Sequence, residues 1–398
     1  MYAGRGIVTT PVFSTRLPST LAANTFSAAI AALRREGVVL ADLTTSNPTK
    51  VGLTYPADLL VPLGDSQGTS YEPHPFGLRS ARQAVVEHLA EGGAATNINT
   101  VVLTASTSEA YSLLFKLLCD PGDTVLTPEP SYPLFELLTR LDSVVSAPYQ
   151  LDHHGVWTID RGSLVAAAAV GRARAILVVS PNNPTGSMLR SGDREWLVTF
   201  ARDHDLALIS DEVFSGYPLE PRPDASSLLG EDRVLTFTLG GLSKSAGLPQ
   251  VKLGWIVATG PVGQVGDALE RLEVICDTYL SVSTPVQVAA ARLIEGGAYV
   301  RRQILERLHI NYRALATACA SDPSVRLLPA EGGWCAVVRV PSTVGEEALA
   351  LRILHDAHVI VHPGYFFDIH QGAHLVVSLL PEPDLFASAI ARVLEIAV

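Results

Sequence analysis

The feature that most constrains this chain is a regular alternation of apolar strand-like runs with amphipathic helical stretches, which begins at residue 101. Parallel strands need a long crossover between them, and a helix usually supplies it. The pattern therefore predicts an α/β fold, with a mostly parallel sheet and helices on both faces. The predicted strands are 101–104, 123–126, 175–180, 206–210, 234–239 and 253–258, and the predicted helices between them are 106–118, 132–141 and 192–203.

The pattern changes on both sides of this region. After Pro261 long helical stretches at 261–295 and 298–320 lead into short strands and helices, which predicts a smaller α+β unit. Its predicted strands are 325–328, 335–340, 359–362 and 375–379, with helices at 345–357 and 384–396. The chain before residue 101 reads as an irregular arm over 1–18, helices at 19–35 and 78–90, a strand at 38–43 and a turn at 44–49.

We therefore expect an N-terminal arm and helix (1–48) that pack with the small domain, a large domain (49–285) and a small C-terminal domain (286–398). Composition excludes several classes of protein: 47% of the 398 residues are hydrophobic, 17% are charged, and the net charge is −11 without a basic cluster. This balance argues for a globular protein and against a nucleic-acid partner.

The cysteines and the apolar segments indicate the cellular compartment of the protein. The four cysteines are scattered and form no CxxC pair, which indicates reduced thiols in a cytoplasmic protein rather than a zinc site or a disulfide framework. The longest aliphatic run, 164–170, is too short to span a bilayer, and the first 18 residues show no signal-peptide pattern. We expect no membrane partner.

One lysine stands out because of its surroundings. Lys244 lies in a stretch of small residues, Gly240 to Pro249, between the apolar runs 234–239 and 253–258. Such a site can remove the amine from water, and desolvation disfavours the ammonium form. A lysine that loses its proton in this way can attack a carbonyl group.

Three other stretches supply groups that a reactive lysine would need. Ser106-Thr107-Ser108-Glu109 opens a predicted helix after a strand; it matches a capping box, and its free amides and hydroxyls also suit an anion. Ser180 to Gly186 places two adjacent amides after a buried strand, although Asn-Pro-Thr-Gly is also a good turn sequence. Asp211 ends the next strand, where a carboxylate needs a partner, such as a helix cap, a salt bridge or a protonated ring nitrogen.

These stretches, in this order, resemble the class I/II aminotransferases of the fold type I pyridoxal phosphate (PLP) enzymes, the aspartate aminotransferase-like group. The resemblance extends from about residue 17 to 393. It implies a mostly parallel sheet of the seven-stranded type in a large PLP-binding domain, and an enzyme that moves an amino group from an amino donor to a keto acceptor. The motifs that carry it are Tyr71…Gly77, Ser106–Ser108, Tyr132, Asn183–Gly186, Asp211, Ser243-Lys244 and Pro363-Gly364…Phe367.

The resemblance also implies roles for individual residues. Lys244 would form the Schiff base with PLP and shuttle a proton, while Asp211 would hold the pyridinium nitrogen. Tyr71 matches a tyrosine that reaches the phosphate of the neighbouring subunit, which implies a homodimer with shared active sites. The remaining matches are Asn183 for the phenolic oxygen, Tyr132 for stacking on the ring, and Ser106, Thr107, Ser108 and Ser243 for the phosphate.

Three positions depart from the family pattern. Lys252 replaces an arginine at the phosphate, which keeps the charge but loses the bidentate fork. Phe214 replaces a tyrosine that donates to the phenolic oxygen, so we expect the Schiff base to have a higher pKa than in the typical member. Val376 replaces the arginine that clamps the substrate's α-carboxylate, which predicts a non-standard substrate unless another arginine, such as Arg16 or Arg339, takes its place. Candidate substrate contacts are Ser46, Trp334 and Tyr365.

Two other functions remain open at this point. The same cofactor supports β- or γ-elimination by a PLP-dependent lyase, because the bond that breaks depends on its orientation to the ring. A different class is a PLP-binding effector or sensor domain, as in transcription regulators, but the segment before residue 19 is too short for the DNA-binding domain that precedes this fold there. His74, His362 and His370 show no metal-ligand spacing, and no metal is predicted.

Overall fold

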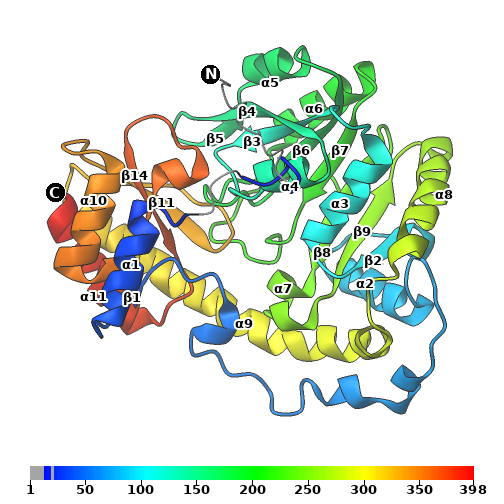
Figure 1. Ribbon diagram of the computed structural model, residues 1–398, viewed down its shortest axis with the longest axis horizontal. Coiled ribbons are helices and arrows are strands. Elements are labelled where there is room, and N and C mark those ends of the chain that lie inside the picture. The colour runs from blue at the N-terminus through cyan, green and yellow to red at the C-terminus, as the bar shows by residue number, and fades with distance from the viewer. Residues whose placement is uncertain (1–12, 19–21) are drawn as a thin grey trace, which may run out of the picture.

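The large sheet forms the centre of the molecule (Figure 1), and the computed structural model describes residues 13–18 and 22–398. In this part of the chain eight strands form the sheet, in the order β2-β9-β8-β7-β6-β3-β4-β5. β4, β3, β6, β7 and β8 run parallel, whereas β9 and β5 are antiparallel to their neighbours, which confirms the predicted mostly parallel α/β fold. The strands are β2 (Val101–Thr104), β3 (Thr124–Glu129), β4 (Val145–His153), β5 (Trp157–Ile159), β6 (Ala173–Val179), β7 (Ala207–Asp211), β8 (Thr236–Gly241) and β9 (Gly254–Thr259).

The eighth strand comes from a hairpin that the sequence pattern did not predict. β4 and β5 pair antiparallel at the edge of the sheet, and helix α5 (Arg161–Ala168) follows them. β4 mixes polar residues and Pro148 with few apolar ones, which is typical of an edge strand and gives a weak signal. The sheet is thus of the predicted mostly parallel type, with β4 and β5 added to the six strands that the pattern predicted and β5 as an extra edge strand.

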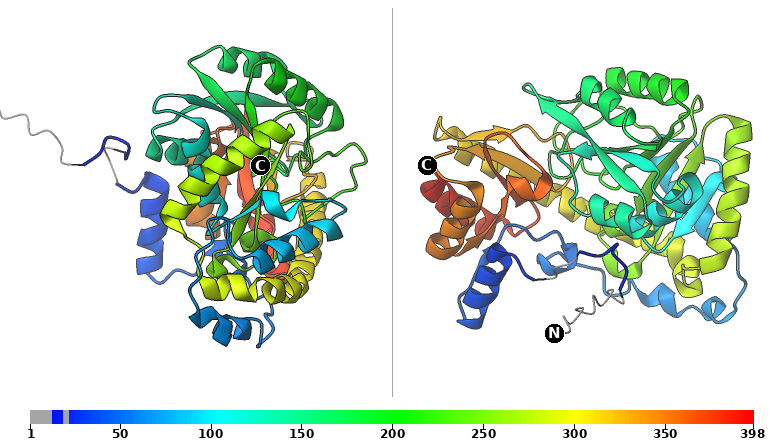
Figure 2. Two further views of the ribbon diagram at one scale, coloured as in Figure 1. Left: turned by 90° about the vertical axis from the view of Figure 1, so that its right-hand side faces the viewer. Right: turned by 45° about the horizontal axis from the view of Figure 1, so that its top comes forward.

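Helices cover both faces of the sheet (Figure 2). On one face α3 (Thr107–Leu118), α4 (Phe135–Leu141) and α8 (Val262–Tyr279) bury apolar side chains against alternate strand residues such as Leu177. On the other face α5 and α6 (Ser191–Asp203) pack on the intervening residues, such as Ile176. The predicted helix over 132–141 begins only at Phe135, so Tyr132 lies in the loop before it.

The longest helix corrects a predicted break. α9 (Thr284–Ala320) runs without interruption through Gly296 and Gly297, whereas the sequence suggested that one helix ended there. The actual break is at 280–283, between α8 and α9, where Leu280 is left-handed and Ser283 and Pro285 begin the new helix.

Gly297 is needed because α9 passes very close to the segment after Lys244. A Cβ built at Gly297 would lie 2.4 Å from the Cβ of Ala246 and 3.2 Å from its Cα. Gly247, which has a φ of +64°, makes a similar approach to Val300 and Ile304 of α9. The glycine that looked like a helix stop therefore permits a close contact between α9 and the lysine segment.

A smaller unit lies at one end of the molecule, with α1 beside it (Figure 1). Its antiparallel sheet has the order β10-β11-β14-β13, and α1 packs through Phe26 and Leu33 on residues near 350–360. α1 begins at Thr25 with Asn24 as its N-cap, later than predicted, because Asn24 accepts the Ser27 amide. The elements are α1 (Thr25–Arg35), β10 (Arg326–Leu328), β11 (Cys335–Val340), α10 (Glu346–Arg352), a π-helical turn (Ile353–Ala357), β13 (His362–Pro363), β14 (Ala373–Ser378) and α11 (Pro383–Ala397).

The other short elements connect these units. The predicted strand over 38–43 is reduced to β1 (Ala41–Asp42), which pairs with β12 (Val359–Ile360). α2 (Arg79–Glu91) contacts α9 and matches its predicted range closely. Most of the predicted arm, residues 1–12, lies outside the described residues. One-turn helices occur at Pro48–Lys50, Val61–Gly64, Ser66–Thr69, Ile98–Thr100, Pro249–Val251 and Gly364–Phe367.

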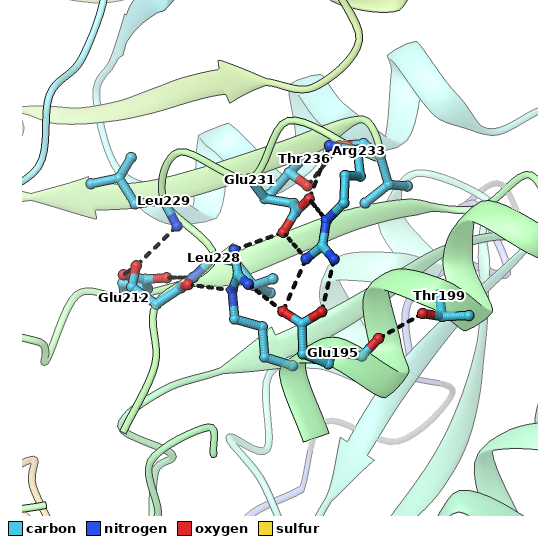
Figure 3. A network of polar contacts seen from close by, with 11 residues as sticks. Glu195, Thr199, Glu212, Leu228, Leu229, Glu231, Arg233 and Thr236 are labelled. Atoms are coloured by element: carbon cyan, nitrogen blue, oxygen red, sulfur yellow. Dashed lines mark hydrogen bonds and ion pairs between the residues drawn. The ribbon is translucent and has the colours of Figure 1, made fainter. Parts of the chain in front are cut away.

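A network of ion pairs fixes the segment between β7 and β8 (Figure 3). Arg233 lies between Glu195 of α6 and the buried Glu231, and donates to both. Glu212, the residue after β7, accepts hydrogen bonds from Ser227 and from the Leu228 amide. The network holds the carboxyl end of β7, where Asp211 lies.

We expect Gly297→Ala to destabilise the protein, because the added methyl group would overlap Ala246. Overpacking of this kind costs about 1–3 kcal/mol. Gly266→Ala in α8 is the matched control, since a Cβ there meets nothing within 4 Å and alanine is favoured in a helix by about 0.5–1 kcal/mol. Urea denaturation measures both, and equal stability of the two variants would contradict the close contact.

Candidate active site

Lys244 lies at the carboxyl end of β8, on the short helix α7 (Leu242–Ser245) rather than in an open turn as predicted. Its Nζ is 4.7 Å from the ring centre of Trp334 and 5.3 Å from that of Phe214. Burial lowers the pKa of Lys244, while the thiol of Cys335 and the carboxylate of Asp211 oppose that shift. The site thus removes the amine from water, as expected for a lysine that must lose its proton.

Tyr217 holds this segment in place. Its hydroxyl donates to the main-chain oxygen of Lys244, and its ring packs edge-on against Trp334 at 5.3 Å. Tyr217 is fully buried, so its position is fixed by packing as well as by the hydrogen bond. A second tyrosine, Tyr55, donates to the Gly247 oxygen at 2.8 Å. Both ends of the lysine segment are therefore anchored from other elements.

Asp211 ends β7, next to β8, and is buried. Its Oδ2 accepts the Tyr111 hydroxyl at 2.6 Å, and its Oδ1 accepts the Val213 amide at 3.1 Å. Burial raises the pKa of the Asp211 carboxyl, and these two donors together with Lys244 lower it. The donors stabilise a buried negative charge, which is what a partner for a cationic ring requires.

The two asparagines in the loop after β6, Asn182 and Asn183, have different hydrogen bonds. Asn182 holds the loop together, because its Nδ2 donates to Pro130 and its Oδ1 accepts from Thr185. Asn183 has a buried Oδ1 that has no hydrogen-bond partner among the described residues. A buried amide oxygen without a partner is costly, so Asn183 is the one that is poised for a ligand.

The predicted capping box at the start of α3 is present. Ser106 accepts the Glu109 amide at 3.2 Å, and Glu109 accepts the Ala105 amide at 2.6 Å. Gly254 of β9 allows this turn to approach closely, since a Cβ there would lie 3.2 Å from the main-chain carbon of Ser106. The amino end of α3, with Thr107 and Ser108 in its first turn, thus lies against the β8–β9 pair that carries Lys244.

The other predicted site residues differ in how deeply they are buried. Phe214 is buried against Trp334 with ring centres 5.4 Å apart, and Ser243 is partly exposed on α7. Tyr132 packs edge-on against Phe135, and its pKa is raised by burial and by the charge of Asp211. Lys252 is exposed and left-handed after the turn at 249–251.

Three predicted residues lie on the surface. Tyr71 is 71% exposed and borders a shallow cavity with Tyr279, while Ser46 is exposed in the loop after β1. Tyr365 is 41% exposed and contacts Phe366, and its amide donates to Glu346. None of the described contacts joins these three side chains to Lys244, so their roles stay predictions.

Val376 does not face a polar pocket. It is buried in an apolar cluster with Trp157, Val337 and Phe367. Of the two arginines considered as substitutes for a clamp, Arg16 donates to the Leu141 oxygen, and Arg339 borders a cavity with His374. Within the described part of the chain, neither guanidinium contacts Lys244 or Asp211.

Sequence reasoning missed Tyr111 and Cys335. Tyr111 follows Ser106 by five residues on the buried face of α3, and a buried tyrosine hydroxyl usually needs a partner, which was the available signal. Cys335 begins β11 near Lys244; burial raises the pKa of its thiol to about 11, against the opposing effect of the Lys244 charge. Its position depends on the small sheet, and no local pattern indicated it.

Two further observations concern metals and membranes. Glu129, Asp368 and His370 place one ligand atom each within 4.8 Å of one another, but two of these residues are exposed, and such acidic groups are common without a metal. In the described residues, none of the helices combines the length and the apolar character needed to cross a bilayer.

The α/β fold with a buried lysine at the end of β8, opposite an aspartate at the end of β7, defines the class of the fold type I PLP enzymes. Solved structures with this fold include an aminotransferase from Escherichia coli (23% identity, 96% of this chain and 97% of that one, TM-score 0.84). An aspartate aminotransferase variant from Thermus thermophilus is similar (22% identity, 97% and 100% covered, TM-score 0.83).

The family model "Aminotransferase class I and II" matches residues 23–384. The chain therefore belongs to the class I and II aminotransferases, which use PLP, as the motif order predicted. Among curated relatives, alanine aminotransferase from Mycobacterium tuberculosis is 28% identical over 91% of this chain and 86% of its own length. Glutamate-pyruvate aminotransferase from Haemophilus influenzae is 25% identical, covering 90% and 91%.

We expect Tyr111→Phe to weaken PLP binding by about tenfold or more, because a hydrogen bond to a buried charge is lost. The pKa of Asp211 should rise further, so the acid limb of the pH–activity profile should shift to higher pH. The control is Tyr149→Phe, which removes an equally buried hydroxyl that donates to a neutral carbonyl, that of Leu177. Titration with PLP and a pH profile provide the measurements. Unchanged values in Tyr111→Phe, or equal effects in both variants, would show that the Asp211 bond is not important.

Proposed function

We propose that this chain is a PLP-dependent aminotransferase in which Lys244 is the reacting lysine. The observation that carries this proposal is the pairing of a buried amine, which has a lowered pKa, with a buried carboxylate on the neighbouring strand. The Asn183 side chain supports it: its Oδ1 has no partner among the described residues, and its Nδ2 would be the donor to the phenolic oxygen. The groups present therefore fit PLP.

Each part of the site suits one part of the cofactor. Asp211 would hold the ring nitrogen, Asn183 the phenolic oxygen and Tyr132 the ring face. The amino end of α3, with Ser106, Thr107 and Ser108, offers free amides and hydroxyls to the phosphate, and Ser243 and Lys252 add a hydroxyl and a positive charge. When bound, PLP supplies an aldehyde that condenses with amines and a ring that accepts electrons from the substrate's Cα.

The chain's own residues then control the proton. Burial against Trp334 and Phe214 disfavours the charged form of Lys244, so its Nζ can accept a proton from the substrate and return it at another carbon. Tyr217 fixes the lysine's main chain, so the amine moves only through its side-chain torsions. Phe214 contributes bulk without a donor, which removes the hydrogen bond that a tyrosine would give at this position.

The departure from the family pattern at position 376 bears on the substrate. We infer that the amino donor is not gripped by an arginine at position 376, because Val376 is packed in an apolar cluster with Trp157 and Val337. The relatives named for alanine and for glutamate and pyruvate make these compounds the natural references. A donor whose carboxylate is absent, or remote from the reacting amine, suits this site better.

A single experiment tests the proposal and the substrate inference together. The PLP-loaded protein is mixed with alanine, with glutamate and with primary amines that lack an α-carboxylate, and conversion of the cofactor to its pyridoxamine form is followed by absorbance. We expect the best amine to exceed alanine and glutamate in kcat/KM by at least about tenfold, because an α-carboxylate that enters an apolar site loses its hydrogen bonds to water without gaining a partner. Lys244→Ala should abolish conversion with every donor.

Each outcome of this experiment has a clear meaning. Efficient use of alanine and glutamate would overturn the substrate inference and leave the aminotransferase standing. Release of ammonia and a keto acid without conversion of the cofactor would show elimination instead. No spectral change with any donor, in protein that holds PLP, would contradict an aminotransferase.

We also propose that the active unit is a homodimer with shared sites. Tyr71 and Tyr279 are 71% and 54% exposed and border the same shallow cavity, and Val61 and Val274 are also exposed. Apolar side chains on a surface often mark an interface. Sedimentation equilibrium tests this assembly, and a monomer at assay concentrations would contradict it.

A further inference from the structure

A cavity of about 320 Å³ lies between the β4–β5 hairpin and the small sheet, apart from the groups described so far. In Figure 1 this hairpin is the part of the large sheet that faces β11 and β14. The hairpin contributes His153 and Trp157 to the cavity wall, and the small sheet contributes Leu328, Arg339 and His374. The cavity therefore spans the junction of the two sheets.

Two exposed arginines lie side by side on the small sheet, and one of them, Arg339, borders the cavity. Arg326 of β10 is directly opposite Arg339 of β11 in the strand register, so their side chains share one face of the sheet. The ion pairs and hydrogen bonds of the described residues include neither guanidinium. Like charges directly opposite each other destabilise a sheet. Burial lowers the pKa of His153, and the charges of Arg326 and Arg339 lower it further.

Three residues that line the cavity with Arg339 have buried nitrogens without hydrogen-bond partners among the described residues. His374 is 5% exposed and Trp157 is 8% exposed, yet His374 Nδ1, Trp157 Nε1 and the His153 Nε2 have no hydrogen-bond partner in the described structure. An unpaired buried polar group is costly, and three of them around one cavity point to a missing acceptor.

His374 lies close to Arg339. A Cβ built at Gly372 would lie 3.4 Å from His374 Cε1 and 3.5 Å from Arg339 Nε, so the absence of a side chain there leaves the space between these groups open. Burial, and then the charges of Arg339 and His153, lower the pKa of His374 to about 4. The imidazole is thus neutral near pH 7 and keeps one N–H that can donate.

The nearby acids do not neutralise the arginines. Glu346 lies 3.9 Å from His374 Nδ1, but its oxygens already accept the amides of Tyr365 and His374. Asp152 and Asp368 border the cavity, and Asp368 is grouped with Glu129 and His370. Within the described residues no carboxylate reaches Arg326 or Arg339 closely enough to form an ion pair.

We propose that this cavity binds a small oxyanion with two negative charges, held by Arg339 and by N–H groups of His374 and Trp157, with Arg326 adding its charge from the neighbouring strand. A guanidinium matches the oxygens of phosphate and carboxylate groups in a bidentate manner. Such a ligand would relieve the repulsion between the two arginines and supply the missing acceptor for the buried nitrogens.

This site is separate from the lysine site. Along β11, Arg339 lies four residues beyond Cys335, the residue near Lys244, which is about 13 Å on a strand. Trp157, Val337 and Val376 form an apolar layer on the same face, between the two ends. The anion is thus either the distal group of a long substrate or a separate effector, and the shared chemistry is the doubly charged oxyanion.

Isothermal titration calorimetry on the PLP-loaded protein, in phosphate-free buffer at constant ionic strength, tests the proposal without any turnover. The probes are inorganic phosphate and malonate, with acetate as the singly charged reference. We expect saturable binding of a doubly charged probe, weakened about tenfold or more in Arg339→Gln and in Arg326→Gln. Arg313→Gln is the control, because Arg313 is an exposed arginine of α9 that bonds only to its own helix, and it should bind as the wild type does.

The absence of saturable binding for both doubly charged probes would overturn the proposal, and so would equal losses in the control and the two variants. Binding that is seen only in PLP-free protein would also overturn it, because the cofactor's own phosphate site would then explain the signal. Where binding is found, competition with the best amino donor assigns the anion site to the substrate, and non-competitive behaviour assigns it to an effector. Both assignments support the site, and neither depends on which donor the enzyme uses.

Discussion

The site depends on one electrostatic pair at the ends of neighbouring strands, the buried carboxylate of Asp211 and the amine of Lys244, whose pKa is lowered by desolvation. Burial alone would neutralise both groups, since it lowers the pKa of the lysine and raises that of the aspartate. Tyr111 and the Val213 amide counter this for Asp211 by donating to it, so the carboxylate can keep its charge. Among the described residues, no equivalent donor or acceptor fixes the Lys244 amine, which faces Trp334 and Phe214.

The rest of the fold positions this pair. β7 and β8 are adjacent and parallel, so their carboxyl ends meet at one edge of the sheet, where ligands of such sheets bind. α9 supports the lysine segment from below through the close approach of Gly297 to Ala246, and Tyr217 and Tyr55 anchor its main chain. The small sheet supplies Cys335 to the surroundings of Lys244 and carries Arg339 and His374 farther along the same face.

Local signals predicted most of this arrangement. The strands that carry Asp211 and Lys244 are apolar and bounded by small residues, and the capping box of α3 is a short motif, so each could be read directly. The β4–β5 hairpin could not, because an edge strand with polar residues has a weak pattern, and Gly296–Gly297 looked like a helix end because their tertiary contacts were unknown. Tyr111, Cys335 and the Arg326–Arg339 pair depend on contacts between distant segments, which spacing does not reveal.

The most direct test of the account is to find which lysine bonds to PLP. The chain has only four candidates, Lys50, Lys116, Lys244 and Lys252. The protein is loaded with PLP, reduced with borohydride and digested, and the modified peptide is identified by mass spectrometry. The account predicts a stable label on Lys244, which disappears in Lys244→Ala, and no comparable label on Lys252. A label on another lysine, or none after loading, would contradict it.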